Sequence, residues 1–456
     1  MEKSKVQCSK SILRLSVVTF IVVTLFLVSA FAPQLLVYAT QRAKLGPVFG
    51  NDASATELER VQAVEDDNRT WIVSKNGTAD FRTIQEAINA ASPGDTISVS
   101  NGTYCENVVV NKTVFIIGQN KWTTTINGSY ADNTVWITSN NVQISGFTIT
   151  GGAPTNVLIG ASTMAKRVIV TDNLICNASC CGMVLVLSDY DRIEGNIIQS
   201  DCGQFGDAEG IRLAGSNGNL IVGNTVKDNH VGIICTWSKD LIGDMTFESS
   251  DNAIYHNSFV QNTIQAEPDS DSTNAWDDGA SGNYWSNYNG TDLNHDGVGE
   301  APYVINGNGL DNHPLMGMFS SFNTSSGEQV SVVSNSTVED FRYFESNKTI
   351  VMHVSNITAN QTYGFCRLTI PRDLISPPYN VTVNNYPANY TTVYENESLS
   401  IIYIGYQHST LEIEVIPEFP SLIILPLVMM ITLLPVIAHT RFKERGEKAR
   451  RGNHNG

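Results

Sequence analysis

Residues 192–198 read Arg-Ile-Glu-Gly-Asn-Ile-Ile and residues 220–226 read Leu-Ile-Val-Gly-Asn-Thr-Val, so one short apolar phrase around an asparagine occurs twice. Three further copies are present, and the central residues of the five copies are Gly146, Asn173, Asn196, Asn224 and Asn257, spaced 27, 23, 28 and 33 residues apart. Copies at this spacing are typical of the coils of a solenoid, because each coil returns the chain to the same corner.

A second phrase interleaves with the first, and its three copies are Cys181-Gly-Met-Val-Leu, Glu209-Gly-Ile-Arg-Leu and Val231-Gly-Ile-Ile-Cys. We therefore expect about three short strands per coil, each paired in parallel with its equivalents about 4.8 Å away. Asparagine or glycine at the corner suits a left-handed backbone, and stacked asparagines can hydrogen-bond as a ladder. A β-sandwich is the alternative, but it would not repeat one corner residue at coil spacing.

One helical pattern precedes the coils. It consists of Phe81, Ile84, Ala87, Ile88 and Ala91, with Asp80 as the expected N-cap and Pro93-Gly94 as the stop.

This helix and the segments beside it, 93–99 and 102–108, resemble the N-terminal cap and first coil of the pectin-lyase-like right-handed parallel β-helices. The later coils resemble the NosD-type repeat, named for a periplasmic copper-associated accessory protein of nitrous oxide reductase. Residues 282–316 resemble the segment that closes that repeat domain. The resemblance implies a right-handed parallel β-helix over residues 70–316. It implies little about activity, because this fold hosts lyases, hydrolases, esterases, epimerases and non-catalytic surface proteins alike.

The two ends of the chain predict export and anchoring. Residues 1–39 have a basic head, an apolar stretch and small residues before a cleavage point, which indicates a signal peptide, with an uncleaved anchor as the alternative. Residues 40–69 are read as a linker. The apolar run 422–438 is long enough for a transmembrane helix, and the basic tail 439–456 then lies in the cytoplasm. A buried core helix is the alternative for this run.

The stretch Pro417-Glu-Phe-Pro-Ser421 precedes this apolar run directly. It resembles the PEF-type C-terminal sorting signals of archaeal surface proteins. The resemblance implies removal of the tail by a sortase-like membrane enzyme and transfer to a lipid anchor. A plain anchor helix is the alternative.

Residues 325–416 change to alternating strands punctuated by prolines, which favours a small immunoglobulin-like β-sandwich. Eight Asn-x-Ser/Thr sequons lie there or just before it, at Asn323, Asn335, Asn347, Asn356, Asn360, Asn380, Asn389 and Asn396. We expect a glycan-coated stalk on the outer surface. The predicted fold class is thus all-β: a solenoid, a small sandwich and a C-terminal transmembrane helix.

The composition limits the partners. The chain is 42% apolar and 16% charged, which excludes a disordered protein, and its 45 acids exceed its 28 bases. Such a surface repels phosphate backbones, so nucleic-acid binding is not expected. Polysaccharide, cell-surface proteins and the membrane remain the expected partners.

The clearest candidate metal site is formed by Asp292, Asn294, Asp296 and Glu300, with Gly297 for the tight turn. These positions match an oxygen-lined calcium loop, although Tyr303 stands where its bidentate carboxylate belongs. The alternatives are a calcium ion that pins the closing segment and an ordinary Asp/Asn/Gly turn.

A candidate catalytic group is formed by Glu209, Arg212 and His230, beside the acid-rich insertion that begins at Asp201. Alternation places Ile211 and Leu213 inside, and it places Arg212 outside with Val184 and Ile234 as its neighbours. An arginine among carboxylates would suit a polysaccharide lyase or hydrolase acting on uronates. Solvated surface charge is the alternative, and we favour it.

Seven cysteines lie beyond the signal segment, and their positions after the corner asparagines predict a disulfide between Cys180 and Cys202 on adjacent coils. A copper site at Cys176, Cys180, Cys181 and Cys202 is the alternative that the family name suggests. No histidine or methionine motif accompanies these thiols, so copper is not expected.

Four aromatics near the end of the solenoid, Trp276, Tyr284, Trp285 and Tyr288, suit either sugar stacking or a plug over the last coil. We favour the plug. Taken together, the sequence predicts an exported, membrane-anchored, non-catalytic surface protein that binds polysaccharide or surface proteins. The alternatives are a lyase or hydrolase and a copper-associated accessory protein.

Overall fold

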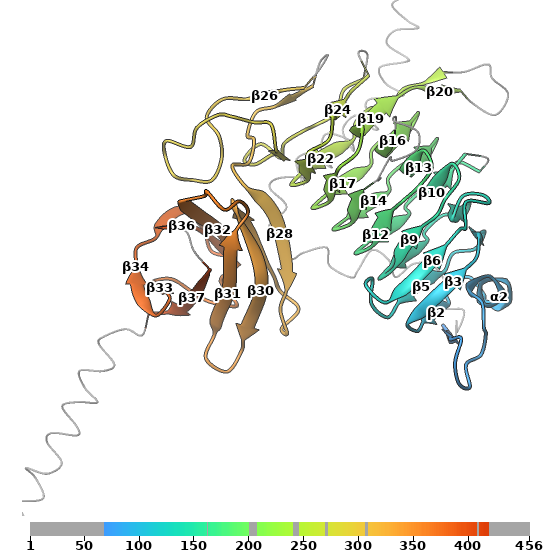
Figure 1. Cartoon of the computed structure of the whole chain (residues 1–456), viewed down its shortest axis with the longest axis horizontal. Helices are drawn as coiled ribbons and strands as arrows, with labels where there is room; N and C mark the ends of the chain where they lie inside the picture. The colour runs from blue at the N-terminus through green and yellow to red at the C-terminus, as the bar shows by residue number, and fades with distance from the viewer. Residues whose placement is uncertain are drawn as a thin grey trace, which may run out of the picture. The chain divides into compact units, whose positions relative to one another are not determined.

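The computed structural model describes residues 68–161, 163–199, 208–239, 246–269, 272–305, 309–407 and 410–418. Three parallel sheets run through its first part, and successive strands of each sheet lie side by side (Figure 1). The first sheet contains β1 (Thr70–Val73), β2 (Thr96–Val99), β5 (Phe115–Gly118), β8 (Gln143–Ser145), β11 (Ile169–Thr171), β14 (Arg192–Glu194), β17 (Leu220–Val222) and β22 (Ala253–Tyr255).

The chain visits the three sheets in turn. The second sheet contains β3 (Gly102–Cys105), β6 (Thr124–Asn127), β9 (Thr148–Thr150), β12 (Leu174–Cys176), β15 (Ile197–Gln199), β18 (Thr225–Lys227), β23 (Ser258–Val260) and β25 (Tyr284–Trp285). The third sheet contains β4 (Val108–Val110), β7 (Val135–Ile137), β10 (Thr155–Gly160), β13 (Cys181–Val186), β16 (Glu209–Ala214), β19 (Val231–Thr236) and β24 (Ile264–Glu267). The predicted parallel β-helix of right-handed type is confirmed.

The interior explains the β-branched composition of the repeats. In each three-residue strand of the first sheet the middle side chain points inward, and the register stacks these side chains into a column of Ile144, Val170, Ile193, Ile221 and Ile254. All five are fully buried in one core cluster that all three sheets share. Branched side chains pack well on such a pleated surface, so stacking stabilises strands that are too short to persist alone.

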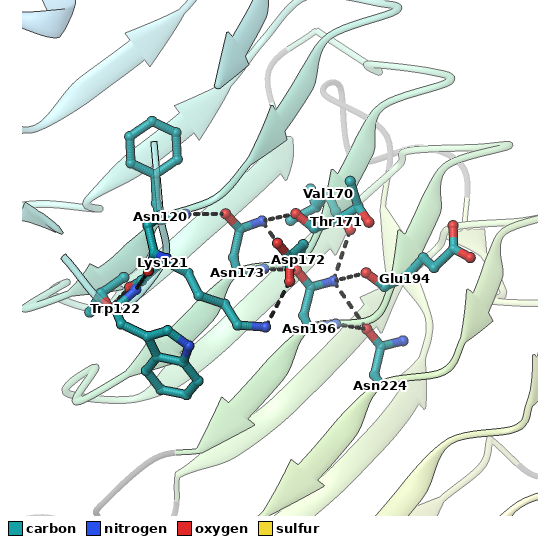
Figure 2. Close-up of polar contacts among 12 residues, drawn as sticks. Asn120, Lys121, Trp122, Val170, Thr171, Asp172, Asn173, Glu194, Asn196 and Asn224 are labelled. Carbon is teal, nitrogen blue, oxygen red and sulfur yellow. Dashed lines mark hydrogen bonds and ion pairs between the residues drawn. The ribbon is translucent and has the colours of Figure 1, made fainter. Parts of the chain in front are cut away.

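The predicted asparagine ladder is confirmed at the corner between the first and second sheets. Asn173, Asn196 and Asn224 are buried, and each donates its backbone N–H and its side-chain amide to Oδ1 of the asparagine in the next coil at 3.0–3.1 Å (Figure 2). The ladder continues through Asn257 and Asn283 and ends at Asp311, whose Oδ2 accepts the Asn283 N–H at 2.8 Å. These side chains pair backbone groups that would otherwise be buried without partners.

The expected role of asparagine as the left-handed residue is wrong. The residue before it takes that conformation, with φ of 54° at Asp172, 63° at Gly195, 66° at Gly223 and 58° at His256. Gly146 belongs to this preceding column, because Phe147 occupies the asparagine position in its coil and donates its N–H to Asn173 Oδ1. The corner therefore divides two tasks between adjacent residues, the turn and the ladder.

The glycines of the second phrase form a column of their own in the third sheet. A Cβ added at Gly210 would lie 2.5 Å from the carbonyl oxygen of Gly232, and one at Gly182 would lie 2.8 Å from that of Gly210. Contacts this short are not possible, so only glycine fits beneath the neighbouring strand. Close backbone approach, rather than coil spacing alone, accounts for this second repeat.

Helix α2 (Ile84–Ala90) precedes the coils, and Ile84, Ala87 and Ile88 join the solenoid core. Its N-cap is Thr83, whose side chain accepts the Glu86 N–H at 3.2 Å, so the prediction of Asp80 as N-cap is wrong. Asp80 instead accepts the Ile72 N–H and ties the preceding loop to β1. A threonine three residues before a glutamate is the better start signal here.

The last coil is covered by aromatic residues, as expected. Trp285 is fully buried and stacks between Phe259 and Tyr303 with ring centroids 4.6 and 4.5 Å away, and Trp276 is also buried. The indole N–H of Trp285 donates to Asp311 at 2.8 Å. Two small antiparallel pairs lie in this half of the solenoid, β20 (Ser238–Lys239) with β21 (Thr246–Phe247) and β26 (Tyr303–Val304) with β27 (Leu310–Asp311).

Two antiparallel sheets follow, starting at Met318 rather than at the expected residue 325, and strands from both contribute to one buried cluster. One sheet contains β28 (Met318–Asn323), β29 (Gln329–Ser334), β32 (Tyr363–Pro371), β36 (Leu399–Gln407) and β35 (Thr391–Glu395). The other contains β30 (Ser336–Phe344), β31 (Thr349–Asn356), β37 (Leu411–Pro417), β33 (Tyr379–Val383) and β34 (Tyr386–Ala388). The five strands in each sheet agree with a sandwich, and the immunoglobulin type stays a prediction.

The predicted signal peptide 1–39, transmembrane helix 422–438 and tail 439–456 lie outside the described residues, as does most of the linker 40–69. Within the ranges that the structure does describe, no helix has the length and apolar character needed to cross a bilayer.

Candidate functional site

The outer face of the third sheet carries the residues that alternation predicted there. Arg212 lies between Val184 and Ile234 in register, and Ile211 and Leu213 on either side of it are fully buried. The predicted facing of Arg212 is therefore correct.

Arg212 is paired with Glu209 from the same strand. Its Nε donates to Glu209 Oε2 at 2.5 Å, and a second guanidinium nitrogen donates to Oε1. The hydrogen-bonded carboxylate raises the pKa of Arg212 above its usual value, so the guanidinium stays cationic. The guanidinium and the carboxylate hydrogen-bond each other, so this arginine is poorly suited to take up a proton in an elimination reaction.

His230 is the third residue of the predicted catalytic group, and the structure does not bring it together with the other two. It is half-buried, its backbone N–H donates to Ala208 at 2.8 Å, and its carbonyl accepts from Ile264 at 2.8 Å. In the part of the chain that the structure describes, its imidazole makes no hydrogen bond or ion pair with Glu209 or Arg212. The acid-rich insertion from Asp201 lies outside that part.

Two cysteines that are adjacent in the sequence lie beside the Glu209–Arg212 pair. The Sγ atoms of Cys180 and Cys181 are 3.0 Å apart, and the Cys181 thiol donates to Glu209 Oε2 at 3.6 Å. Burial is the main cause that raises the pKa of Cys181, and the Cys180 thiol and Glu209 add to it. Cys202, the predicted disulfide partner of Cys180, lies outside the described residues, so that disulfide stays a prediction.

The predicted calcium loop is a tight turn stabilised by its own carboxylates. Asp292 accepts the backbone N–H groups of Asp296 and Gly297 at 3.0 and 2.9 Å, and Glu300 accepts those of Leu293 and Asn294. These backbone hydrogen bonds lower the pKa of Glu300. The amide of Asn294 donates to Asp296 at 2.9 Å, which closes the loop further.

Metal ligands are not grouped anywhere in the described ranges. No three His, Cys, Asp or Glu side chains lie there in positions that would hold one ion. The calcium loop therefore stays a prediction and the copper site stays the alternative, and neither geometry by itself provides a set of ligands around one point.

The sequence reading missed a polar and aromatic group at the corner between β5 and β6. Trp122 is 63% exposed, and Lys121 beside it places its ammonium 5.5 Å from the indole centre and 2.7 Å from the Asp172 carboxylate. Figure 2 shows the Lys121 side chain extending from the corner that carries Trp122 toward Asp172, alongside Asn173 of the ladder. The available signal was a tryptophan inside a longer polar corner, Asn120-Lys-Trp-Thr, where later coils turn on two residues such as Asp172-Asn173 or Gly195-Asn196.

The same corner is held rigidly. The side-chain oxygen of Asn120 accepts the backbone N–H of Trp122 at 2.8 Å. The backbone carbonyl of Asn120 accepts the backbone N–H groups of Thr123 and Thr124. The carbonyl of Lys121 accepts the Thr148 hydroxyl at 2.5 Å, which fastens the corner to the next coil. An exposed indole on a fixed backbone is pre-organised for contact with a ligand.

Five of the eight predicted glycan acceptors are exposed, at Asn323, Asn347, Asn360, Asn380 and Asn389. Asn356 and Asn396 are half-buried. Asn335 is half-buried as well, and its amide is used at both ends, because it donates to Tyr363 at 3.3 Å and accepts the Phe365 N–H at 2.9 Å. The exposed five are therefore the better acceptors.

Comparison with known proteins agrees with the repeat pattern. Residues 84–290 match the family model described as "Periplasmic copper-binding protein (NosD)". A protein of Stutzerimonas stutzeri described as "Probable ABC transporter binding protein NosD" is 32% identical over 155 residues, which cover 32% of this chain and 34% of the relative. The protein of the same description from Pseudomonas aeruginosa is 30% identical over 155 residues, which cover 32% of this chain and 33% of that protein.

This chain thus spans about a third of the length of the curated relatives it matches. Among solved structures, the pectate lyase Pel9A aligns with a TM-score of 0.36 at 14% identity, covering 49% of this chain and 71% of the lyase. The predicted resemblance to NosD-type repeats is confirmed by the family match.

Proposed function

We propose that this chain, which carries a NosD-type β-helix domain at residues 84–290, is an exported and membrane-anchored surface protein that binds polysaccharide at the Trp122 corner. The observation that carries the proposal is the exposed indole of Trp122 beside the Lys121–Asp172 ion pair. An indole offers a flat apolar surface, and a sugar ring has one face of C–H groups that can stack on it. The neighbouring ammonium and carboxylate provide a donor and an acceptor for hydroxyl groups.

The charge of the chain favours a neutral polysaccharide over an acidic one. The formal net charge is −17, and Asp172 is largely exposed while Lys121 is mostly covered. A polymer of uronates would meet repulsion on approach, whereas a neutral polymer would not. We therefore propose a neutral polysaccharide as the ligand.

Affinity electrophoresis tests this proposal. The purified full chain in detergent migrates through gels that contain a neutral glucan, mannan or galactan, with an acidic uronan gel as the comparison. Retardation in at least one neutral gel that is lost in Trp122→Ala supports the proposal. The control variant is Trp237→Ala, because Trp237 is also exposed, at 53%, but lies elsewhere on the solenoid. Retardation in no neutral gel would contradict polysaccharide binding, and equal retardation of both variants would contradict the site.

Export and anchoring rest on the ends of the chain and on its sequons. The predicted signal peptide, the apolar run 422–438 before a basic tail, and the exposed sequon asparagines of the sandwich all suit a protein outside the cytoplasm. Protease treatment of intact cells should degrade the solenoid while the tail survives. Protection of the solenoid would place it inside the cell and end the proposal.

The Asp292–Glu300 loop is proposed as a weak calcium site that pins the closing segment. Its acid and amide oxygens are of the type that calcium binds, and the backbone hydrogen bonds leave further lone pairs on the carboxylates. Isothermal titration with calcium chloride should show one weak site that Asp292→Asn removes. An unchanged titration in that variant would place the binding elsewhere.

A copper-associated role is the alternative that the family description suggests. The described cysteines Cys176, Cys180 and Cys181 lie close together in the sequence, and their thiolates would be the copper donors. Stoichiometric Cu(I) after anaerobic reconstitution, lost on Cys181→Ser, would favour that role over polysaccharide binding.

A further inference from the structure

We propose that Cys180 and Cys181 form a reversible disulfide between adjacent residues, at the start of β13 in the third sheet and next to the Glu209–Arg212 pair. The Sγ–Sγ separation is 3.0 Å, only about 1 Å longer than a disulfide bond. This proposal concerns a modification site and does not depend on the polysaccharide that the protein binds.

The backbone presents the two sulfurs in different surroundings. The N–H groups of both cysteines donate to the Pro154 carbonyl, at 3.0 and 3.2 Å, and the Cys180 carbonyl accepts the Glu209 N–H at 3.0 Å. These bonds fasten the pair to the coils on both sides. Cys180 is exposed and Cys181 is buried, so an external reagent reaches Cys180 first.

The buried sulfur has a proton acceptor. Burial keeps the Cys181 thiol protonated, and its hydrogen bond leads to Glu209 Oε2 at 3.6 Å. The guanidinium of Arg212 is hydrogen-bonded to the same carboxylate, so Glu209 connects the buried thiol to a fixed positive charge. The Glu209–Arg212 pair thereby has a role that does not require it to act on a sugar.

The reaction balances as an exchange with an external disulfide, either a small-molecule disulfide such as oxidised glutathione or a protein disulfide. The Cys180 thiolate attacks one sulfur of the external disulfide, forms a mixed disulfide and releases one thiol. Cys181 then passes its proton to Glu209 and attacks the Cys180 sulfur, which releases the second thiol as it takes up a proton. Two cysteine thiols are oxidised and one external disulfide is reduced to two thiols.

The oxidised form changes the neighbouring pair. Once the sulfurs are bonded, Cys181 no longer donates to Glu209, and among the described contacts of this carboxylate the two hydrogen bonds from Arg212 remain. The bond also removes both thiols from reaction with soft metals, which bind thiolates. An oxidising exterior, where exported proteins keep their disulfides, favours this form.

Mass spectrometry of the full chain tests the proposal. The protein is equilibrated with oxidised glutathione, its free thiols are alkylated, and it is digested without reduction. The expected result is one linear peptide with both cysteines unalkylated and two hydrogen atoms lighter than the dithiol form. Prior reduction should restore two alkylation sites. A link from Cys180 to the peptide of Cys202, or two alkylated cysteines after oxidation, would overturn the proposal.

A variant separates the chemistry from mere proximity. Glu209→Gln keeps the side-chain size but removes the proton acceptor, so the second step should slow several-fold and glutathione should accumulate on Cys180. Cys235 serves as the internal control, because it is buried in the core and should stay a thiol throughout. Unchanged kinetics in Glu209→Gln would contradict the role of the carboxylate. The peptide from the wild-type protein tests separately whether the disulfide forms.

Discussion

Asn224 Oδ1 accepts two hydrogen bonds from Asn196, one from its backbone N–H and one from its side-chain amide, each at 3.0 Å. Asn224 in turn donates its amide to the carbonyls of Ile193 and Val222 at 2.8 and 3.2 Å. With its further bond to Asn257 Oδ1 at 3.0 Å, this one side chain serves five polar groups at a corner where both asparagines are 1% exposed. Every coil depends on the next for this pairing, which makes the ladder a cooperative element of the solenoid.

Asn224→Ala should therefore destabilise the protein strongly. The substitution leaves the buried Asn196 N–H and the Ile193 carbonyl without their partners, and each unpaired buried group costs about 1–3 kcal/mol. The unfolding free energy from urea titration should fall by about 3–5 kcal/mol. Thr225→Ala, at the adjacent outward position, is the control and should change it by less than about 1 kcal/mol. Equal effects of the two changes would mean that the ladder asparagine contributes no more to the unfolding free energy than the outward threonine does.

Asp191 should make the protein less stable as the pH rises. Burial raises its pKa from 3.8 to about 7, so the folded chain holds this proton where the unfolded chain has released it. Between pH 4 and 7 the unfolding free energy should fall by about 1.4 kcal/mol per pH unit from this group, and it should level off above pH 7.

Asp191→Asn isolates that contribution, because Asn219 and Asn252 already occupy the equivalent corner in the following coils. The variant should gain stability over the wild type progressively from pH 4 to 7 and keep that gain at pH 8, measured by urea titration at each pH. A gain that is the same at pH 4 and at pH 8 would show that the carboxyl does not titrate in this window. The difference from wild type cancels the opposite trend of His256, whose pKa burial lowers to about 4.

Trp285→Ala should open the plug at the end of the solenoid. The fully buried indole stacks on two rings and donates to Asp311, so its loss leaves a cavity and should cost about 3–5 kcal/mol. Trp285→Phe keeps the stacking but loses the hydrogen bond, so its thermal midpoint should lie between those of the wild type and Trp285→Ala. A thermal midpoint of Trp285→Ala equal to that of the wild type would show that the aromatic plug does not stabilise the solenoid.

Arg212 should not support turnover of acidic polysaccharides. Its guanidinium is occupied by Glu209 and its pKa is raised, so neither proton transfer nor free carboxylate binding is favoured. Incubation of the full chain with a panel of uronic-acid polymers, with and without calcium, should yield no unsaturated or reducing-end products. Reproducible products that disappear in Arg212→Ala would establish the lyase or hydrolase instead.

The sequence was sufficient to predict the repeating core, because the interior imposes a strict demand at every coil. Inward positions such as Ile193 and Ile221 must be apolar and in register, and the corner Asn196 must repeat at the coil spacing. These demands leave a periodic trace in the chain. The facing of Arg212 followed from the same alternation.

The candidate sites could not be predicted in the same way. The contact of Lys121 with Asp172 joins residues 51 positions apart in the sequence, on corners that lie two coils apart, and no local pattern marks it. The left-handed column at Asp172 and Gly195 was assigned to the adjacent asparagine, because both residue types tolerate that conformation. His230 lies in the corner directly before β19, the strand that pairs with the strand of Glu209, and alternation says nothing about the direction of a corner side chain.

The affinity of the Trp122 corner for a neutral polysaccharide is the most direct test of the account. Titration of the full chain with the retarding polymer, followed by tryptophan fluorescence, should give an affinity that Trp122→Ala weakens at least tenfold and Trp237→Ala leaves unchanged. The thermal midpoint of Trp122→Ala should equal that of the wild type, because the indole is exposed. Undiminished affinity in a folded Trp122→Ala would contradict the account.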